Sequence, residues 1–295
     1  MKINQSLKTH KLLETFHQEM GKIIFYFNQC VESVQYDSKE KLVFYVLIKK
    51  IISNATSANI LIYEGLINEA KIVLRSAIES VILVTYLSQF PDKIKDYLDE
   101  AQIIKIKNNF IVLKNMKEGE PIDVYGNTCT KEDLIEENKR CFDKISKSAK
   151  NKILTGLKLK EFNITDENFN KFDKYFTDFR PHFMKFDKMF RELDNKGFKI
   201  KDVQNYSLKD IVFCFYNESS QVAHGCFLDW HHKIKFNKKE SEYLFSYFIK
   251  VTLFLQVLIK ETLNLKPQNT NTYINEMKKA HSNLELLIYG HKLKH

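Results

Sequence analysis

The sequence predicts an all-α protein: a helical bundle of roughly nine or ten helices that carries a helical insertion lobe. Apolar residues recur every three or four positions in nearly every segment, which is the repeat of one face of an α-helix. Glycine and proline are scarce, at 8 and 4 residues, and this disfavours a turn-rich all-β fold. Hydrophobic residues make up 44% of the chain, enough for a sizeable core.

Four helices are expected in the first part of the chain. Ser38 is suited to cap the start of the second helix, and Gly65 to stop it. The third helix is apolar around most of its circumference, as helices at the centre of a bundle are. Pro91 breaks it, and a fourth helix follows. We expect these helices at residues 7–34, 39–63 and 68–89, and from Pro91 to about Met116.

The middle of the chain, residues 117–200, is predicted to be a basic and aromatic lobe inserted into a core bundle of residues 1–116 and 201–295. It begins with residues 117–130, which contain glycine and proline and are typical of an exposed connection. Two short Phe-rich amphipathic helices then lie on either side of Pro181.

Capping patterns mark three helix starts in the second half of the chain. Thr130, Ser207 and Asn237 are each followed three residues later by an acidic residue, which can bond back to the start of the helix. Thr130 therefore starts the helix of the basic segment. The last helices are expected at residues 207–225, 237–265 and 271–289.

Cysteine use and hydropathy favour a cytoplasmic protein without stable membrane insertion. The five cysteines are odd in number and widely spaced, which argues against a disulfide framework or a zinc ribbon. The N-terminus lacks the apolar core of a signal peptide. The apolar runs at 72–87 and 244–259 contain charges and are shorter than the roughly 20 residues of a membrane span.

The sequence lacks the motifs of several well-known kinds of chemistry. The sequence has no phosphate-binding Walker loop, no dinucleotide fingerprint and no His-Glu-x-x-His, so we expect no nucleotide or nicotinamide cofactor. His231 and His232 lie near His224 and Cys226, but adjacent histidines point apart on a helix or strand, which disfavours a metal site.

A basic segment at residues 139–160 carries eight basic residues against one acid. Such a local excess attracts phosphate-rich partners, so RNA or a nucleotide is a candidate ligand. The alternative is a solvated lysine-rich face without a dedicated partner. The candidate RNA-binding residues are Lys144, Lys147, Lys150 and Lys152.

Two distant helices each carry polar groups four residues apart, a spacing that aligns side chains on one face. The first has Arg75 and Glu79, and the second has Tyr216, Ser220 and His224. If the helices pack together, a guanidinium, a carboxylate, two hydroxyls and an imidazole converge as a candidate catalytic centre. The alternatives are an internal Arg–Glu bridge that fixes the packing of its helix, and a capping or core histidine.

These two helices resemble a broad family of bacterial and archaeal helical proteins of unknown function. The resemblance covers about residues 40–260 and implies the fold and a prokaryotic origin. It rests on Gly65, Glu69, Ala70, Arg75, Ser76 and Glu79, followed by Tyr216, Ser220, His224 and Gly225.

More distantly, an all-α bundle with a polar Arg/His centre is similar to the HEPN superfamily. That resemblance implies a metal-independent ribonuclease of a toxin–antitoxin or antiphage system. The signature of the superfamily is Arg, four residues, then His on one helix, and no arginine here has His at that spacing. Catalysis by this route therefore requires Arg75 and His224 to meet from different helices.

The sequence leaves three functional hypotheses. The first is the ribonuclease or toxin, with Arg75, Glu79, His224, Ser220 and Tyr216 as its centre. The second is a non-catalytic helical sensor or binding module, as a homodimer, for a small anionic ligand or a partner protein. The third is a protein that docks on a membrane or partner through its Phe-rich helices at 169–190.

Overall fold

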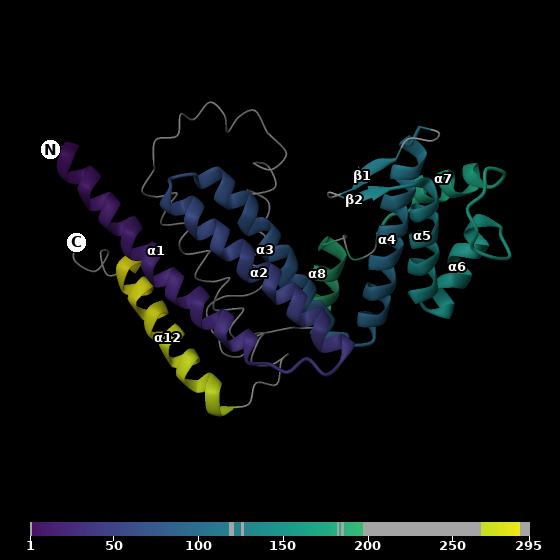
Figure 1. Cartoon of the computed structure of the whole chain (residues 1–295). Coiled ribbons are helices and arrows are strands. Elements are labelled where there is room, and N and C mark those ends of the chain that lie inside the picture. Colours follow the sequence, from purple (N-terminus) through teal and green to yellow (C-terminus); the bar gives the residue numbers. More distant parts are fainter. Residues whose placement is uncertain are drawn as a thin grey trace. The chain divides into compact units, whose positions relative to one another are not determined.

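The computed structural model describes residues 2–117, 121–124, 127–181, 183, 186–196 and 267–289. Within these ranges it contains nine α-helices and one short β-hairpin, so the predicted all-α class is confirmed (Figure 1). The chain divides into two compact units. We call Met1–Gln89 with Met189–His295 the bundle unit, and Phe90–Lys188 the inserted unit.

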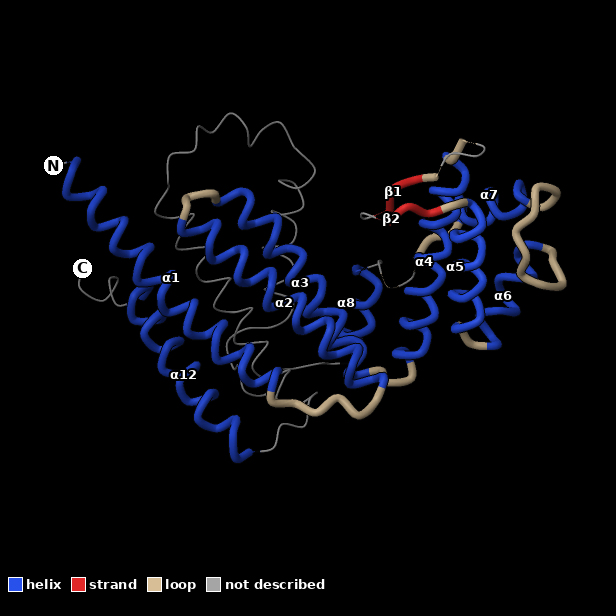
Figure 2. Tube along the Cα trace, viewed as in Figure 1, coloured by secondary structure: helices blue, strands red, loops and turns tan. Residues whose placement is uncertain are grey.

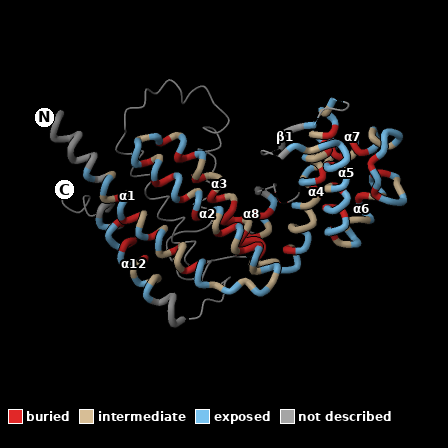
Figure 3. The backbone as a smooth tube through the Cα atoms, in the orientation of Figure 1, coloured by how far each residue is buried: buried red, intermediate tan, exposed pale blue. Residues whose placement is uncertain are grey.

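The described part of the bundle unit contains four long helices: α1 (Lys2–Glu32), α2 (Lys39–Tyr63), α3 (Ile67–Gln89) and α12 (Pro267–Tyr289). α2 packs against both α3 and α1, and α1 packs against α12, so the spatial order is α3–α2–α1–α12 (Figures 1 and 2). Buried residues, mostly aliphatic, run along both α2 and α3 (Figure 3). α3 is thus buried over most of its circumference, as its apolar pattern predicts.

Local signals set the helix ends. Ser38 Oγ accepts a hydrogen bond from the Lys41 N–H at 3.2 Å, which confirms the predicted cap of α2. After α2, Gly65 adopts a left-handed φ of 76°, which glycine reaches without a side-chain clash. α12 starts at Pro267, ahead of the predicted Asn271, because proline suits the first position of a helix.

Most of α8 (Phe186–Asn195) belongs to the bundle unit and is tied to α3. Tyr86, which is fully buried, donates its hydroxyl to Glu192 Oε2 at 2.6 Å. Lys196 Nζ donates to the Gln89 carbonyl at 2.6 Å. These contacts hold the end of α3, where the chain leaves the bundle unit, next to α8, where the chain returns to it.

The inserted unit is built around an aromatic core. The rings of Phe142 and Phe162 stack at 4.2 Å between centroids, and Phe110 contacts both Phe172 and Phe176. Its elements are α4 (Lys93–Asn115), β1 (Ile122–Val124), β2 (Asn127–Cys129), α5 (Lys131–Lys144), α6 (Lys147–Leu157) and α7 (Phe169–Asp178).

The antiparallel hairpin β1–β2, with Ile122 opposite Cys129, lies in the stretch predicted as an exposed connection. The unit boundaries also differ from the predicted 117 and 200, since they fall at residues 90 and 188. The reason is that Ile106 and Phe110 of α4 belong to the same core cluster as α5, α6 and α7. α4 is therefore part of the inserted unit.

Four of the described phenylalanines of residues 169–190 lie in the interior. Phe172 and Phe176 are buried in the core of the inserted unit, and Phe183 and Phe190 are buried as well. These four rings are therefore not exposed for docking on a membrane or a partner. No helix in the described ranges is both long and apolar enough to span a bilayer. The helices predicted at 207–225 and 237–265 lie outside the described residues.

Candidate functional site

Arg75 and Glu79 form an ion pair within α3. Arg75 Nε donates to Glu79 Oε1 at 3.1 Å, one helical turn apart. The Arg75 side chain is 18% exposed and that of Glu79 is 41% exposed. A guanidinium this sheltered is costly unless charge and hydrogen bonds compensate it, and the carboxylate supplies one such contact. The pair is the predicted one, and it lies at the edge of the buried surface of α3.

Lys71 extends this pair into a polar stripe. It was not among the site residues predicted from the sequence. It lies one turn before Arg75 on the same face of α3 and is only 4% exposed. A buried ammonium is rare and needs compensation, as a guanidinium does. The signal was available, because Lys71 is spaced four residues from Arg75 just as Glu79 is. We call Lys71, Arg75 and Glu79 the α3 polar stripe.

The second half of the predicted centre cannot be placed. Tyr216, Ser220 and His224 lie outside the described residues. Their convergence with Arg75 and Glu79 therefore stays a prediction.

The predicted RNA-binding lysines lie at the end of α5 and along α6, in the inserted unit. Lys144, Lys147 and Lys152 are exposed. Lys150 is held locally instead: its Nζ donates to the Asp143 carbonyl at 2.9 Å and lies 5.5 Å from the centroid of the Phe142 ring. Three of the four lysines are therefore open to a phosphate ligand, and Lys150 serves the turn between α5 and α6.

α6 is fixed in place by a contact with α4. The N–H of Ser146 donates to Asp99 Oδ1 at 2.8 Å, and its hydroxyl contacts Asp99 Oδ2. Ser146 Oγ also accepts from the Ala149 N–H at 3.3 Å and so caps α6. The exposed lysines of α6 thus stand on an anchored helix.

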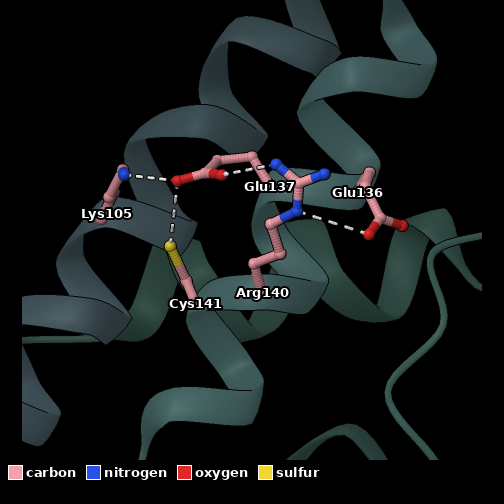
Figure 4. Close-up of polar contacts among 5 residues, drawn as sticks. All are labelled: Lys105, Glu136, Glu137, Arg140 and Cys141. Atoms are coloured by element: carbon pink, nitrogen blue, oxygen red, sulfur yellow. Dashed lines mark hydrogen bonds and ion pairs between the residues drawn. The ribbon is translucent and has the colours of Figure 1, made fainter.

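Other basic residues of this region form a structural network between α4 and α5 (Figure 4). Lys105 Nζ contacts Glu137 Oε1, and this hydrogen bond lowers the pKa of the Glu137 carboxyl and raises that of Lys105. Arg140 pairs with Glu136 at 3.5 Å and with Glu137 at 3.8 Å. Arg140 is therefore held in ion pairs with residues of its own helix in the inserted unit.

Cys141 lies beside this network, with Sγ 3.8 Å from Glu137 Oε1. Burial is the largest cause of the raised pKa of its thiol. A thiol held in the protonated form is a poor nucleophile, so Cys141 acts as a buried core residue and not as a reactive group. In the described ranges no three histidine, cysteine, aspartate or glutamate side chains gather as a metal site.

Comparison with known families identifies the chain. A family profile matches residues 41–243, which is most of the sequence. The chain belongs to DUF5677, a family of unknown function. This confirms the expected membership of a helical family without an assigned role. No curated protein and no solved structure matches the chain.

The DUF5677 match contains every candidate catalytic and RNA-binding residue predicted from the sequence. It spans the α3 polar stripe, the lysines of α5 and α6, and the segment from Tyr216 to His224. The N-terminal helix α1 up to Glu32 and the C-terminal helix α12 lie outside it. The candidate residues therefore all belong to the DUF5677 region of the chain.

Proposed function

We propose that this DUF5677 protein is a metal-independent ribonuclease, acting as a toxin or antiphage effector in the bacterial cytoplasm. The observation that carries the proposal is the α3 polar stripe, in which two sheltered cations and a carboxylate interrupt a largely buried helix. Sheltered cations are the groups that stabilise developing phosphoryl charge. The exposed Lys144, Lys147 and Lys152 supply a surface for the RNA backbone.

In this proposal His224 removes the proton from a ribose 2′-hydroxyl, whose oxygen then attacks the adjacent phosphorus. The bond to the 5′-oxygen breaks, and the leaving oxygen takes up a proton from the His224 imidazolium or from water. Arg75 balances the charge on the phosphoryl oxygens, and Glu79 orients Arg75 through Nε. Ser220 or Tyr216 positions His224. No step needs a metal ion.

The test is cleavage of single-stranded RNA in EDTA by wild type, Arg75→Ala, Glu79→Gln and His224→Ala. Losing Arg75 should lower the cleavage rate by about 10²- to 10³-fold, as losing one charge-stabilising donor does. Losing His224 should lower it by about 10²- to 10⁴-fold. Arg191→Ala is the matched control, because Arg191 is an exposed arginine of α8. Thermal melts of each variant separate lost chemistry from lost folding.

The second candidate is a non-catalytic sensor or binding module, as a homodimer, for a small anionic ligand or a partner protein. It is favoured by the Arg75–Glu79 contact, which holds the guanidinium within its own helix. On this reading Arg75→Ala mainly destabilises the fold. We expect about 1–3 kcal/mol, below the cost of breaking a fully buried pair, because Glu79 is 41% exposed.

The two candidates give opposite results in the same experiment. Folded variants that lose cleavage, beside an active Arg191→Ala, support the ribonuclease. Absence of cleavage by wild type, together with a low melting temperature for Arg75→Ala alone, supports the binding module. Light scattering on the wild type tests the homodimer.

A further inference from the structure

A groove of about 520 Å³ lies in the inserted unit, between the end of α6 and α7. This volume is within the range of small-molecule sites. Its lining is cationic and aromatic. The lining residues are Gly156, Leu157, Lys158, Lys171, Lys174, Tyr175, Asp178 and Phe179.

Two elements bring the lysines together. Lys171, Lys174 and Asp178 share one face of α7 through spacings of three and four, opposite the phenylalanines that face the core. Lys158 comes from the other side, where it ends α6 in a left-handed conformation with φ of 56°. The groove therefore holds three ammonium groups and one carboxylate.

These three ammonium groups make no hydrogen bond or ion pair with any residue in the described ranges, and neighbouring lysines behave differently. Lys114 of α4 pairs with Asp173 at 2.8 Å, and Lys131 of α5 pairs with Asp166 at 3.3 Å. Three lysines against the single carboxylate of Asp178 leave the groove with a net positive charge, which favours a bound anion.

Tyr175 forms an aromatic wall of the groove. Its ring packs so closely on α6 that a Cβ added at Gly156 would lie 2.5 Å from Tyr175 Cε2. Its other neighbour is Phe176, at 5.3 Å between centroids and nearly perpendicular. Burial raises the pKa of the Tyr175 hydroxyl, so the ring stays neutral beside the lysines. Aromatic rings next to lysines are typical of sites that bind nucleobases and phosphates together.

The groove adjoins the lysine face of α6. A second hollow, lined by Ser148, Asn151, Lys152 and Thr155, shares Gly156 with it. A strand whose phosphates follow Lys152 would thus lead into the groove.

We propose that this groove binds a nucleotide unit, with its phosphate on Lys158, Lys171 and Lys174 and its base or sugar against Tyr175. The ligand chemistry is the same in a free nucleotide and in single-stranded RNA. The RNA form rests on the proposed ribonuclease function, whereas the free-nucleotide form does not.

The test measures binding to the full chain by fluorescence anisotropy, using a labelled 2′-O-methyl RNA of mixed sequence that cannot be cleaved through its 2′-oxygen. Calorimetry with AMP is the second arm. Lys171→Gln/Lys174→Gln should weaken binding about ten-fold and reduce the slope of log affinity against log salt by about 1.4, which corresponds to two lost phosphate contacts. Lys50→Gln/Lys95→Gln is the matched control, because these exposed lysines of α2 and α4 lie outside the basic segment and do not line the groove.

The site is supported if the groove variant binds either probe more weakly and the control variant does not. The probe that is affected shows whether the ligand is single-stranded RNA or a free nucleotide. Equal effects of the two double variants, or no binding of either probe by wild type, overturn it. If the groove variant unfolds, lysine footprinting on wild type decides: the probe must protect Lys171 and Lys174 and not Lys95. Cleavage of unmodified RNA is scored separately, so a failed groove and a failed ribonuclease are told apart.

Discussion

At Gly156 two effects of opposite sign act on a substitution by alanine. In a helix, alanine is more stable than glycine by about 1 kcal/mol. At this position, however, the new Cβ lies 2.5 Å from Tyr175 Cε2 and 2.9 Å from Cδ2. The ring also packs edge-on against Phe176, so moving it aside disturbs that contact. Overpacking of this kind costs about 1–3 kcal/mol and outweighs the gain in propensity.

We therefore predict that Gly156→Ala lowers the free energy of unfolding by about 1–2 kcal/mol. Urea denaturation measures it. Thr155→Ala, at the exposed neighbouring position of α6, is the control and should change stability little. A stabilised Gly156→Ala would mean that Tyr175 moves freely.

His281 of α12 makes stability depend on pH. It is 4% exposed, and in the described part of the chain neither ring nitrogen has a hydrogen-bond partner. Burial lowers its pKa from 6.5 to about 4. Between these values the unfolded chain binds more protons than the folded one, so stability falls as the pH falls. The contribution is fully present above pH 6.5 and is lost toward pH 4.

We predict a loss of about 3 kcal/mol across that pH range, from the size of the shift in pKa. Denaturant unfolding of wild type and His281→Leu at several pH values measures it. The variant should lose less stability than wild type on acidification. Parallel curves for the two proteins would show that His281 is not responsible.

At the scale of elements, Ser146 both caps α6 and bonds to Asp99 of α4. We predict that Ser146→Ala lowers the free energy of unfolding by about 1–2 kcal/mol, because it leaves an uncapped helix and a carboxylate without one donor. Thermal and urea unfolding give the value. Ser148→Ala, an exposed serine in the first turn of α6, is the control. If both variants melt alike, the Ser146 hydroxyl contributes no stability.

Helix ends were predictable where a local signal sets them. Ser38 and Thr130 cap α2 and α5 as expected, and Gly65 follows the end of α2. The partner of a helix was less predictable, because α4 looks the same in sequence whether its apolar face meets α3 or α5. The hairpin at residues 122–129 was missed because strands of three residues are too short to show alternation.

The candidate site was predictable in part. Arg75 and Glu79 meet as their spacing indicated, and the same spacing would have found Lys71. Counting charges could not show that Lys150 is held by Asp143, or that Arg140 pairs within α5. It also missed Lys171 and Lys174, since they reach the groove from a Phe-rich helix outside the basic segment.

At the scale of the whole molecule, the inserted unit has a core of its own. Among the described residues, its buried cluster draws only on those between Ile103 and Phe176. We therefore predict that a fragment of residues 90–188 folds alone and unfolds in one cooperative transition, which circular dichroism during heating can follow. Phe172→Ala removes a fully buried ring and should abolish that transition in the fragment. A fragment without a cooperative transition would show that its core needs the bundle unit.

The ties of α8 to α3 have a consequence for the history of the chain. Tyr86 bonds to Glu192, and Lys196 bonds to the Gln89 carbonyl, so the exit and return of the polypeptide are clamped side by side. Excising residues 90–188 would thus leave two ends that a short linker can rejoin. The inserted unit can therefore be gained, lost or exchanged as one piece by recombination, with the bundle unit left intact.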